Sequence, residues 1–210
     1  MNRPVMPIAP RRQIVARLAG ALFACGLLSS CGDNSATSTE RPPLEGAAIG
    51  GEFELVDSMG QTVRAGDFDG EYLMVYFGYA YCPDVCPFDL QRMMQGYRQF
   101  AEEHPDLGTK VQPIFITVDP ERDTPEVVGE FTANFGDNLV GLTGTPEQIA
   151  EAARTFSVYY AKNEESAGAG YLMDHSRAAF LMGPKGEPIA LLPVEASGPE
   201  VAAELGKWVS

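Results

Sequence analysis

The sequence predicts an α/β fold in which a mixed sheet is flanked by helices. Two near-continuous apolar runs, residues 73–79 and 111–118, have the pattern of strands that are covered on both faces. Each run is followed by a segment with helical character. Alternation of strands and helices favours a parallel layer with helices on both faces.

The first predicted element is an N-terminal hairpin. Residues 52–56 and 61–64 favour β-structure and are separated by the turn-forming letters DSMG. The central strand 73–79 follows, and apolar residues then recur at helical spacing from Pro87 until the helix breaker Pro105. The hairpin is therefore an addition in front of a strand and helix pair.

Two further helices have recognisable start signals. Thr124 is predicted to cap a helix that begins at Pro125 and runs to Phe135. A short strand at 139–142 precedes a second such helix, for which Thr145 is the expected cap. Residues 158–161 are ambiguous between a helix end and a strand.

The C-terminal part is predicted to add a second hairpin and a closing helix. Residues 178–182 and 189–192 favour strands on either side of GPKGEP, and residues 200–209 favour a helix. This order of elements is that of a thioredoxin-like domain, which we expect to span residues 51–210. In open sheets of this kind, ligands bind at the carboxyl ends of the strands.

Residues 1–30 have the features of an export signal, with four arginines, no acidic residue and a short apolar run. The run closes with LLSSC, which resembles the lipobox of bacterial lipoproteins. The resemblance implies that Cys31 is the first mature residue and carries lipid; an ordinary secretory signal is the alternative. Cys25 would be removed with the signal. We therefore expect the domain to be anchored in the bacterial cell envelope, facing the periplasm or exterior.

Residues 31–50 are polar and contain paired prolines, a composition that predicts a flexible tether. Without the signal, eleven basic residues face 29 acidic ones, a net charge near −18. Such a field makes nucleic acid a poor partner.

Cys82 and Cys86 are the only cysteines predicted to remain in the domain. A single bridge across so few residues adds little stability, so the pair is expected to serve chemistry. It lies between a buried strand and the start of a helix, where amide groups and the helix dipole favour thiolates. The pair could form a redox couple or bind a metal.

The chain has two histidines. His104 is expected at a helix end, where a cation suits the dipole and no further role is needed. His175, in YLMDHSRAAFLM, lies just before a predicted strand. A turn residue that is hydrogen-bonded beside Asp174 and Ser176 would have the same pattern, so the residue alone leaves its role open.

Three motifs together are similar to those of the Sco/SenC family of copper proteins: FGYAYCPDVCP, VDPERDTPE and DHSRAAFLMGPKGE. The resemblance implies a thioredoxin-like fold and one copper ion held by Cys82, Cys86 and His175. It also implies delivery of copper to the dinuclear site of apo-cytochrome c oxidase subunit II. Where the family often has a polar pair before the first cysteine, this chain has Ala80 and Tyr81.

The donor chemistry agrees with copper. Thiolates select Cu(I), and imidazole suits both Cu(I) and Cu(II). Structural zinc sites are normally closed by four protein ligands, whereas three are offered here. Three aspartates are candidates for orienting His175 or the loop, with plain capping or turn roles as the alternative: Asp119, Asp123 and Asp174.

A thiol-disulfide oxidoreductase acting on exported or membrane proteins is the alternative function. Thioredoxin-type reductases favour two residues between their cysteines, whereas three occur here, and His175 would then have no clear duty. A peroxidase on the same fold is less favoured, because its second cysteine does not follow so closely. We expect a metallochaperone rather than an enzyme, with another exported copper or thiol protein as the other possible partner.

Overall fold

Strand β3 (Tyr72–Gly78) is the central strand of the fold, and all of its residues are buried. It pairs in parallel with β4 (Val111–Thr117) and antiparallel with β8 (Ala179–Met182). These positions come from a computed structural model, which describes residues 40–164 and 170–210. The two apolar runs of the sequence thus form neighbouring strands covered on both faces, as predicted.

The main sheet has seven strands in the order β2-β1-β5-β4-β3-β8-β9. The parallel part is β5-β4-β3, and antiparallel hairpins lie at both edges. The predicted mixed α/β sheet with an added N-terminal hairpin is therefore confirmed. The remaining strands of this sheet are β1 (Glu54–Asp57), β2 (Thr62–Arg64), β5 (Val140–Thr143) and β9 (Pro188–Leu192).

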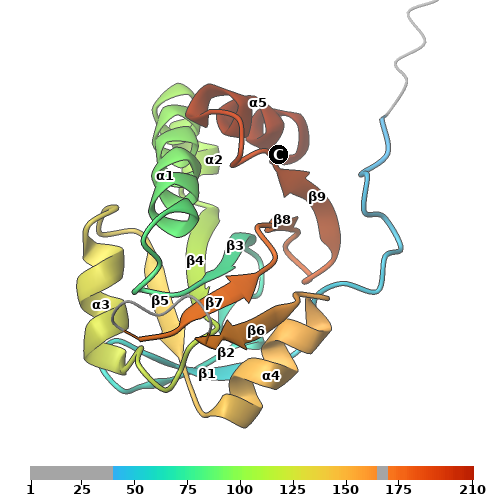
Figure 1. Cartoon of the computed structure of the whole chain (residues 1–210). Coiled ribbons are helices and arrows are strands. Elements are labelled where there is room, and N and C mark those ends of the chain that lie inside the picture. Colours follow the sequence, from blue (N-terminus) through green and yellow to red (C-terminus); the bar gives the residue numbers. More distant parts are fainter. Residues whose placement is uncertain (1–39, 165–169) are drawn as a thin grey trace, which may run out of the picture. The chain divides into compact units, whose positions relative to one another are not determined.

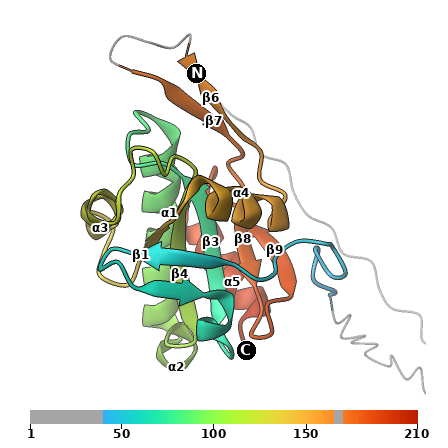
Figure 2. The ribbon, with the colours of Figure 1, turned by 90° about the horizontal axis from the view of Figure 1, so that it is seen from below.

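Helices α1 (Val85–Glu103) and α5 (Gly198–Trp208) lie side by side on one face of the sheet (Figure 1). Their close approach depends on Gly96, where a Cβ atom would lie 2.5 Å from Cβ of Val201. Helix α4 (Pro146–Thr155) covers the other face (Figures 1 and 2). The sheet is thus flanked by helices on both sides.

The helix caps read from the sequence are present. The Thr124 side chain accepts a hydrogen bond from the amide of Val127 at the start of α3 (Pro125–Ala133). Thr145 and Gln148 form a reciprocal capping box at the start of α4. Two short elements were not predicted: the 3-10 turn η1 (Ala65–Phe68) and the helix α2 (Pro105–Gly108).

A second, two-stranded sheet was also missed. Strands β6 (Tyr160–Asn163) and β7 (Leu172–His175) pair antiparallel and form a ribbon that projects from the body of the domain (Figure 2). The ambiguous segment 158–161 leads into the first of these strands. The sequence predicted His175 in the segment just before β8, whereas it is the last residue of β7.

The predicted tether is too long at its C-terminal end. Residues 40–50 belong to the same compact unit as the rest of the domain, and Leu44 and Ile49 pack against the core. The amide of Leu44 also donates to the carbonyl of Ile189. Few but well-placed apolar side chains fix this segment. The proposed signal, Cys25, Cys31 and the first part of the tether lie outside the described residues.

In the ranges 40–164 and 170–210, no helix combines the length and apolar character needed to span a bilayer.

Candidate metal centre

The two cysteines follow the carboxyl end of β3, as the sequence indicated. Cys82 lies in the loop after the strand, and Cys86 lies in the first turn of α1. Both are free thiols; Cys86 is buried and Cys82 is partly exposed. The amide of Cys86 lies 3.4 Å from Sγ of Cys82 and donates to it. The unpaired amides at the helix start therefore face the more accessible sulfur.

Gly78, the last residue of β3, makes room for the second sulfur. A Cβ atom at this position would lie 3.1 Å from Sγ of Cys86 and 3.0 Å from Cε1 of Tyr76. Contacts this short are rare for real side chains, so a side chain here would require Cys86, Tyr76 or Phe115 to shift by a few tenths of an ångström. The glycine in the FGY motif is therefore explained by packing against the site.

His175 completes the cluster from the far end of the domain's sequence. Its Nε2 atom lies 3.1 Å from Sγ of Cys86, and its Nδ1–H donates to the carbonyl of Ser176 at 2.9 Å. In the neutral ring with its proton on Nδ1, Nε2 carries the lone pair that a metal ligand needs. The ligand atoms of Cys82, Cys86 and His175 all lie within 4.8 Å of one another. The three residues that the sequence singled out are thus brought together.

Two tyrosines hold the imidazole ring in place. The rings of Tyr76 and Tyr79 meet the ring of His175 edge-on, with centroids 6.2 Å and 5.9 Å away. Such edge contacts are a favoured aromatic arrangement. Both tyrosines belong to β3 or its immediate end, so the ring is located relative to the strand that also leads to the cysteines.

The two thiols differ in acidity. The pKa of Cys82 is lowered to about 4, mainly by a hydrogen bond from Cys86, while partial burial opposes the shift. The pKa of Cys86 is raised, because its proton is held in that hydrogen bond and because the sulfur is buried. The metal-free pair therefore holds one thiolate, at Cys82, and one thiol at neutral pH.

A buried carboxylate beside the site was not predicted from the sequence. Asp89 is fully buried on α1 and accepts hydrogen bonds from the hydroxyl of Tyr76 and the guanidinium of Arg177. A signal for it existed, since Asp89 stands three residues after Cys86 on the same helix face, where the neighbouring side chains are apolar. A carboxylate on a buried face needs a partner.

The three aspartates proposed to orient the site behave differently. Asp123 accepts a hydrogen bond of 2.8 Å from the amide of Ala80, and so fixes the loop that leads to Cys82. Asp119 is buried and pairs with Arg122 and Tyr171. Asp174 is exposed and lies near Asn163 across the ribbon. The Nδ1 atom of the imidazole is held by the backbone carbonyl of Ser176 and not by one of these carboxylates.

His104 lies at the C-terminal end of α1, where its ring packs against Phe100 with centroids 5.1 Å apart. It is exposed and is not part of the cysteine cluster. This agrees with the expectation of a helix-end residue.

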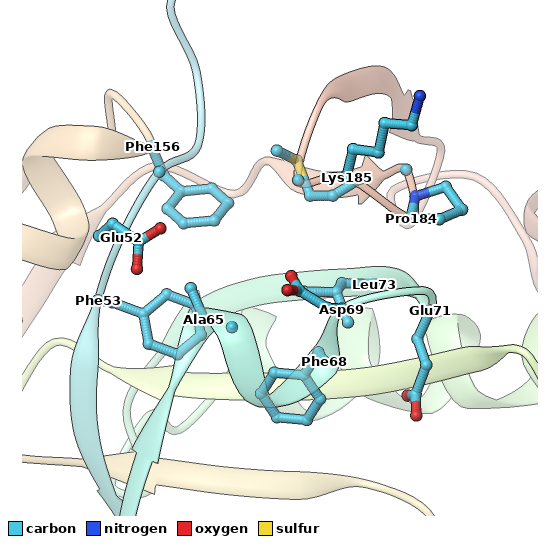
Figure 3. Close-up of a pocket in the computed structure, with 15 residues that line it drawn as sticks. Glu52, Phe53, Ala65, Phe68, Asp69, Glu71, Leu73, Phe156, Pro184 and Lys185 are labelled. Atoms are coloured by element: carbon cyan, nitrogen blue, oxygen red, sulfur yellow. The ribbon is translucent and has the colours of Figure 1, made fainter.

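A cavity of about 120 Å³ lies elsewhere in the domain (Figure 3). Its lining includes the aromatic rings of Phe53, Phe68 and Phe156 and contains no cysteine or histidine. It borders Leu73, at the amino end of β3, whereas the cysteines follow the carboxyl end of that strand. The cavity therefore does not contribute to the metal centre.

The donor set fits a soft metal ion. Two sulfurs and one imidazole nitrogen suit copper, and the thiolate form that copper needs is already present at Cys82. Among the residues that the structure describes, no fourth Cys, His or carboxylate ligand joins this group. A closed tetrahedral zinc site therefore cannot be built from these side chains alone.

Comparison with known proteins gives a consistent result. The family model described as SCO1/SenC matches residues 41–210. The chain is 43% identical over 144 residues to the protein SCO2 homolog, mitochondrial, of Mus musculus, covering 68% of this chain and 56% of that protein. It thus spans only about half the length of this curated relative. The match to the protein SCO1 homolog 1, mitochondrial, of Arabidopsis thaliana is 41% over 152 residues, covering 72% of this chain and 44% of that protein.

Solved structures show the same relationship. A crystal structure of Arabidopsis thaliana ScoI with copper bound matches with a TM-score of 0.69 and 36% identity, covering 76% of this chain and 96% of that one. The structure of Bradyrhizobium japonicum ScoI with copper bound matches with a TM-score of 0.68 and 35% identity, covering 77% and 99%. The domain shares their thioredoxin-like fold.

Proposed function

This chain belongs to the SCO1/SenC family, and from that premise we propose that it binds one copper ion through Cys82, Cys86 and His175 and passes the ion to another protein. The observation that carries the proposal is the meeting of these three donor atoms within 4.8 Å. Relatives solved with copper bound support the choice of metal.

The chain's own groups account for both binding and release. Cys82 supplies a ready thiolate, and binding a metal at Cys86 displaces the proton that this thiol shares with Cys82. Nε2 of His175 lies 3.1 Å from the sulfur of Cys86 and, with the ring proton on Nδ1, has a lone pair available for a metal. Because Cys82 is partly exposed and three ligands leave copper coordinatively open, a ligand from a recipient can approach from that side.

The recipient that the family resemblance favours is the dinuclear copper site of apo-cytochrome c oxidase subunit II. Another exported copper or thiol protein is the alternative recipient. The partly exposed sulfur supports transfer by direct contact between the two proteins. Transfer of copper from the loaded chain to the isolated apo-subunit, followed by the absorption of the dinuclear centre, would test this choice.

Copper titration tests the site itself. The full chain is used with Cys25 and Cys31 replaced by serine, so that Cys82 and Cys86 are the only thiols. Competition with a Cu(I) chelator under reducing conditions should give one ion per chain. His175→Ala should weaken binding by more than the ~100-fold that loss of an outer partner of a ligand typically costs.

The matched control for this titration is His104→Ala, which removes the exposed histidine at the end of α1. It should bind copper as the parent chain does. Equal affinity of His175→Ala and the parent would contradict the proposal.

Membrane attachment through lipid on Cys31 is part of the same proposal and rests on the N-terminal sequence pattern. It would place the domain at the bacterial cell envelope, facing the periplasm or exterior. Labelling cells with an alkyne-bearing fatty acid should mark the parent chain but not Cys31→Ser, and the variant should leave the membrane fraction. Labelling that survives the substitution would refute lipid attachment at Cys31.

Thiol-disulfide exchange is the second candidate function, and the contrast between the two thiols favours it. An accessible sulfur with a low pKa, followed by a buried thiol, suits attack on a disulfide and then resolution of the mixed disulfide. Reduction of a general disulfide substrate should then be unaffected by His175→Ala. If that variant reduces disulfides as well as the parent while copper binding by the parent is weak, exchange is the main role.

A further inference from the structure

We infer that Asp89 and Arg177 are positioning residues that hold the His175 imidazole against the two cysteines. The inference rests on the proposed copper site and adds to it a pair of residues that touch no ligand atom of the metal. Its basis is the way in which the structure connects the part that carries the histidine to the part that carries the cysteines.

The ligands come from two separately hydrogen-bonded parts of the domain. Cys82 and Cys86 lie at the junction of β3 and α1, on the main sheet and its covering helix. His175 ends β7, which belongs to the two-stranded ribbon and not to the main sheet. The nearest strand pairing to the main sheet is four residues further on, where Ala179 of β8 pairs with Tyr76 of β3, so strand pairing alone does not orient the imidazole against the sulfurs. Other contacts must do so.

One of these contacts is an ion pair next to the ligands, in addition to the bonds from Arg122 and Tyr171 that hold the ribbon further from the site. Nε of Arg177 lies 3.0 Å from Oδ2 of Asp89, and Nη2 lies 2.8 Å from Oδ1. A two-point guanidinium–carboxylate contact fixes orientation as well as distance. Asp89 has no exposed surface and Arg177 is only 35% exposed, so water competes little for the carboxylate.

Both residues of this pair lie close in sequence to a metal ligand. Asp89 follows Cys86 by one helical turn, and Arg177 follows His175 by two residues. Each member is therefore attached to a ligand by a few backbone bonds. A change in the distance between α1 and the segment after β7 would be passed directly to the gap between Cys86 and His175.

Tyr76 joins the same contact to the ring itself. Its hydroxyl donates to Oδ2 of Asp89 at 3.0 Å, and its ring meets the His175 ring edge-on. The carboxylate thus organises the backbone beside the histidine through Arg177 and one wall of the imidazole through Tyr76. Removing Arg177 should loosen the backbone beside His175, whereas Tyr76 would remain in β3.

The chain contains a matched control for this pair. Arg92 also approaches Asp89, with Nη1 3.8 Å from Oδ1, but it lies on α1 itself and also donates to the carbonyls of Val194 and Glu195. It therefore touches the same carboxylate without reaching the segment that carries His175. Arg92→Gln and Arg177→Gln each remove one positive charge near Asp89, and only the second removes a contact to the segment directly after His175, together with the Arg177 pair with Glu195.

The first test uses the metal-free protein. In the full chain with Cys25 and Cys31 replaced by serine, ring-proton Overhauser contacts between His175 and Tyr79 should be present under reducing conditions. Arg177→Gln should weaken them, and Arg92→Gln should leave them unchanged. Unchanged contacts in Arg177→Gln would overturn the inference, whatever the protein does with copper.

The second test measures Cu(I) affinity by chelator competition. Arg177→Gln should bind about tenfold to a hundredfold more weakly, the range found for partners that orient a metal ligand, and Arg92→Gln should stay within about twofold of the parent. In a His175→Ala background, Arg177→Gln should cause no further loss, because there is no imidazole left to position. A loss of equal size in both backgrounds would show a general structural role and overturn the inference.

Arg177→Gln leaves a buried carboxylate with fewer partners, which can unfold a domain. Two variants keep the tests decisive in that case. Asp89→Asn with Arg177→Gln removes both charges while keeping hydrogen-bonding groups, and Arg177→Lys keeps the charge but loses the two-point contact. The double variant should weaken copper binding as stated above, and Arg177→Lys should fall between it and the parent; parental affinity of both would overturn the inference. Failure of the parent chain to bind Cu(I) would refute the proposed function and leave the metal-free test to decide the positioning role.

Discussion

Nε2 of His175 lies 3.1 Å from Sγ of Cys86, although 89 positions separate the two residues in the sequence. The ring proton on Nδ1 is held by the carbonyl of Ser176. The fold itself thus brings these donor atoms together. A preformed site loses less conformational freedom on binding than one that must be gathered from mobile segments.

Alkylation should distinguish the two cysteines. Because the pKa of Cys82 is lowered to about 4 and its sulfur is partly exposed, it should react with iodoacetamide well below neutral pH. Its rate should fall only as the pH approaches about 4, whereas buried Cys86 should react slowly throughout. Peptide mass spectrometry after timed alkylation of the reduced, metal-free chain measures both rates. A rate for Cys82 that falls away near pH 8, as for an ordinary thiol, would contradict this assignment.

The same shift predicts a dependence of stability on pH. Cys82 ionises at about pH 4 in the folded state but at about 8.5 in the unfolded chain. Between these values the unfolded state binds more protons, so the contribution of Cys82 to the free energy of unfolding rises with pH and is lost as the pH falls through about 4. Cys82→Ser should therefore be destabilising near pH 7 and much less so near pH 4. Urea titrations of the metal-free, reduced parent and variant would show a gap that does not change with pH if this prediction is wrong.

Gly78→Ala should damage both stability and the metal centre. The added Cβ would meet Sγ of Cys86 at 3.1 Å and Cε2 of Phe115 at the same distance, and overpacking of this kind costs about 1–3 kcal/mol. Gly206→Ala is the control, since the position is exposed in α5 with open space around the new methyl group. It should stabilise the helix by about 0.5–1 kcal/mol. Urea denaturation measures both changes, and chelator competition should show weaker Cu(I) binding for Gly78→Ala alone.

The aspartates can be separated by their burial. Asp123→Ala removes the acceptor of the Ala80 amide at 2.8 Å and of the buried Thr117 hydroxyl at 2.6 Å. Each donor left unsatisfied costs about 1–3 kcal/mol. Asp174→Ala changes an exposed side chain of the ribbon and should stay within about 0.5 kcal/mol of the parent. Equal unfolding free energies for the two variants would contradict the role assigned to Asp123.

Copper should stabilise the folded chain if it binds only that state. At a free Cu(I) concentration about one hundred times the dissociation constant, the gain is about 2.7 kcal/mol. The melting temperature should rise on addition of Cu(I) and return when a chelator removes it. His175→Ala should show a much smaller rise at the same copper concentration. A rise that is identical in parent and variant would mean that the metal binds elsewhere.

Local patterns in the sequence were sufficient to predict much of the fold. The apolar runs became β3 and β4, and Thr124 and Thr145 cap the helices that they were expected to cap. Such signals are local, because a buried strand or a helix start is written in a few consecutive residues. The two cysteines and the histidine were also singled out, from their motifs and their scarcity.

Contacts between distant segments decided the rest. Strand β7 was not predicted, because a short strand in a projecting ribbon has few buried apolar residues to indicate it. Residues 40–50 were assigned to a tether, although Leu44 and Ile49 pack on the core.

The contacts that support the site were likewise decided by the tertiary structure. Which aspartate supports which group, and that Arg177 reaches Asp89 across 88 positions, follow only from the packing of α1 against the segment after β7. The sequence by itself determined which donor atoms are available for a metal. The tertiary structure decided how they are held together. An ion pair or a backbone carbonyl at the right distance depends on the path of the whole chain, and such contacts produce no periodic pattern in the sequence.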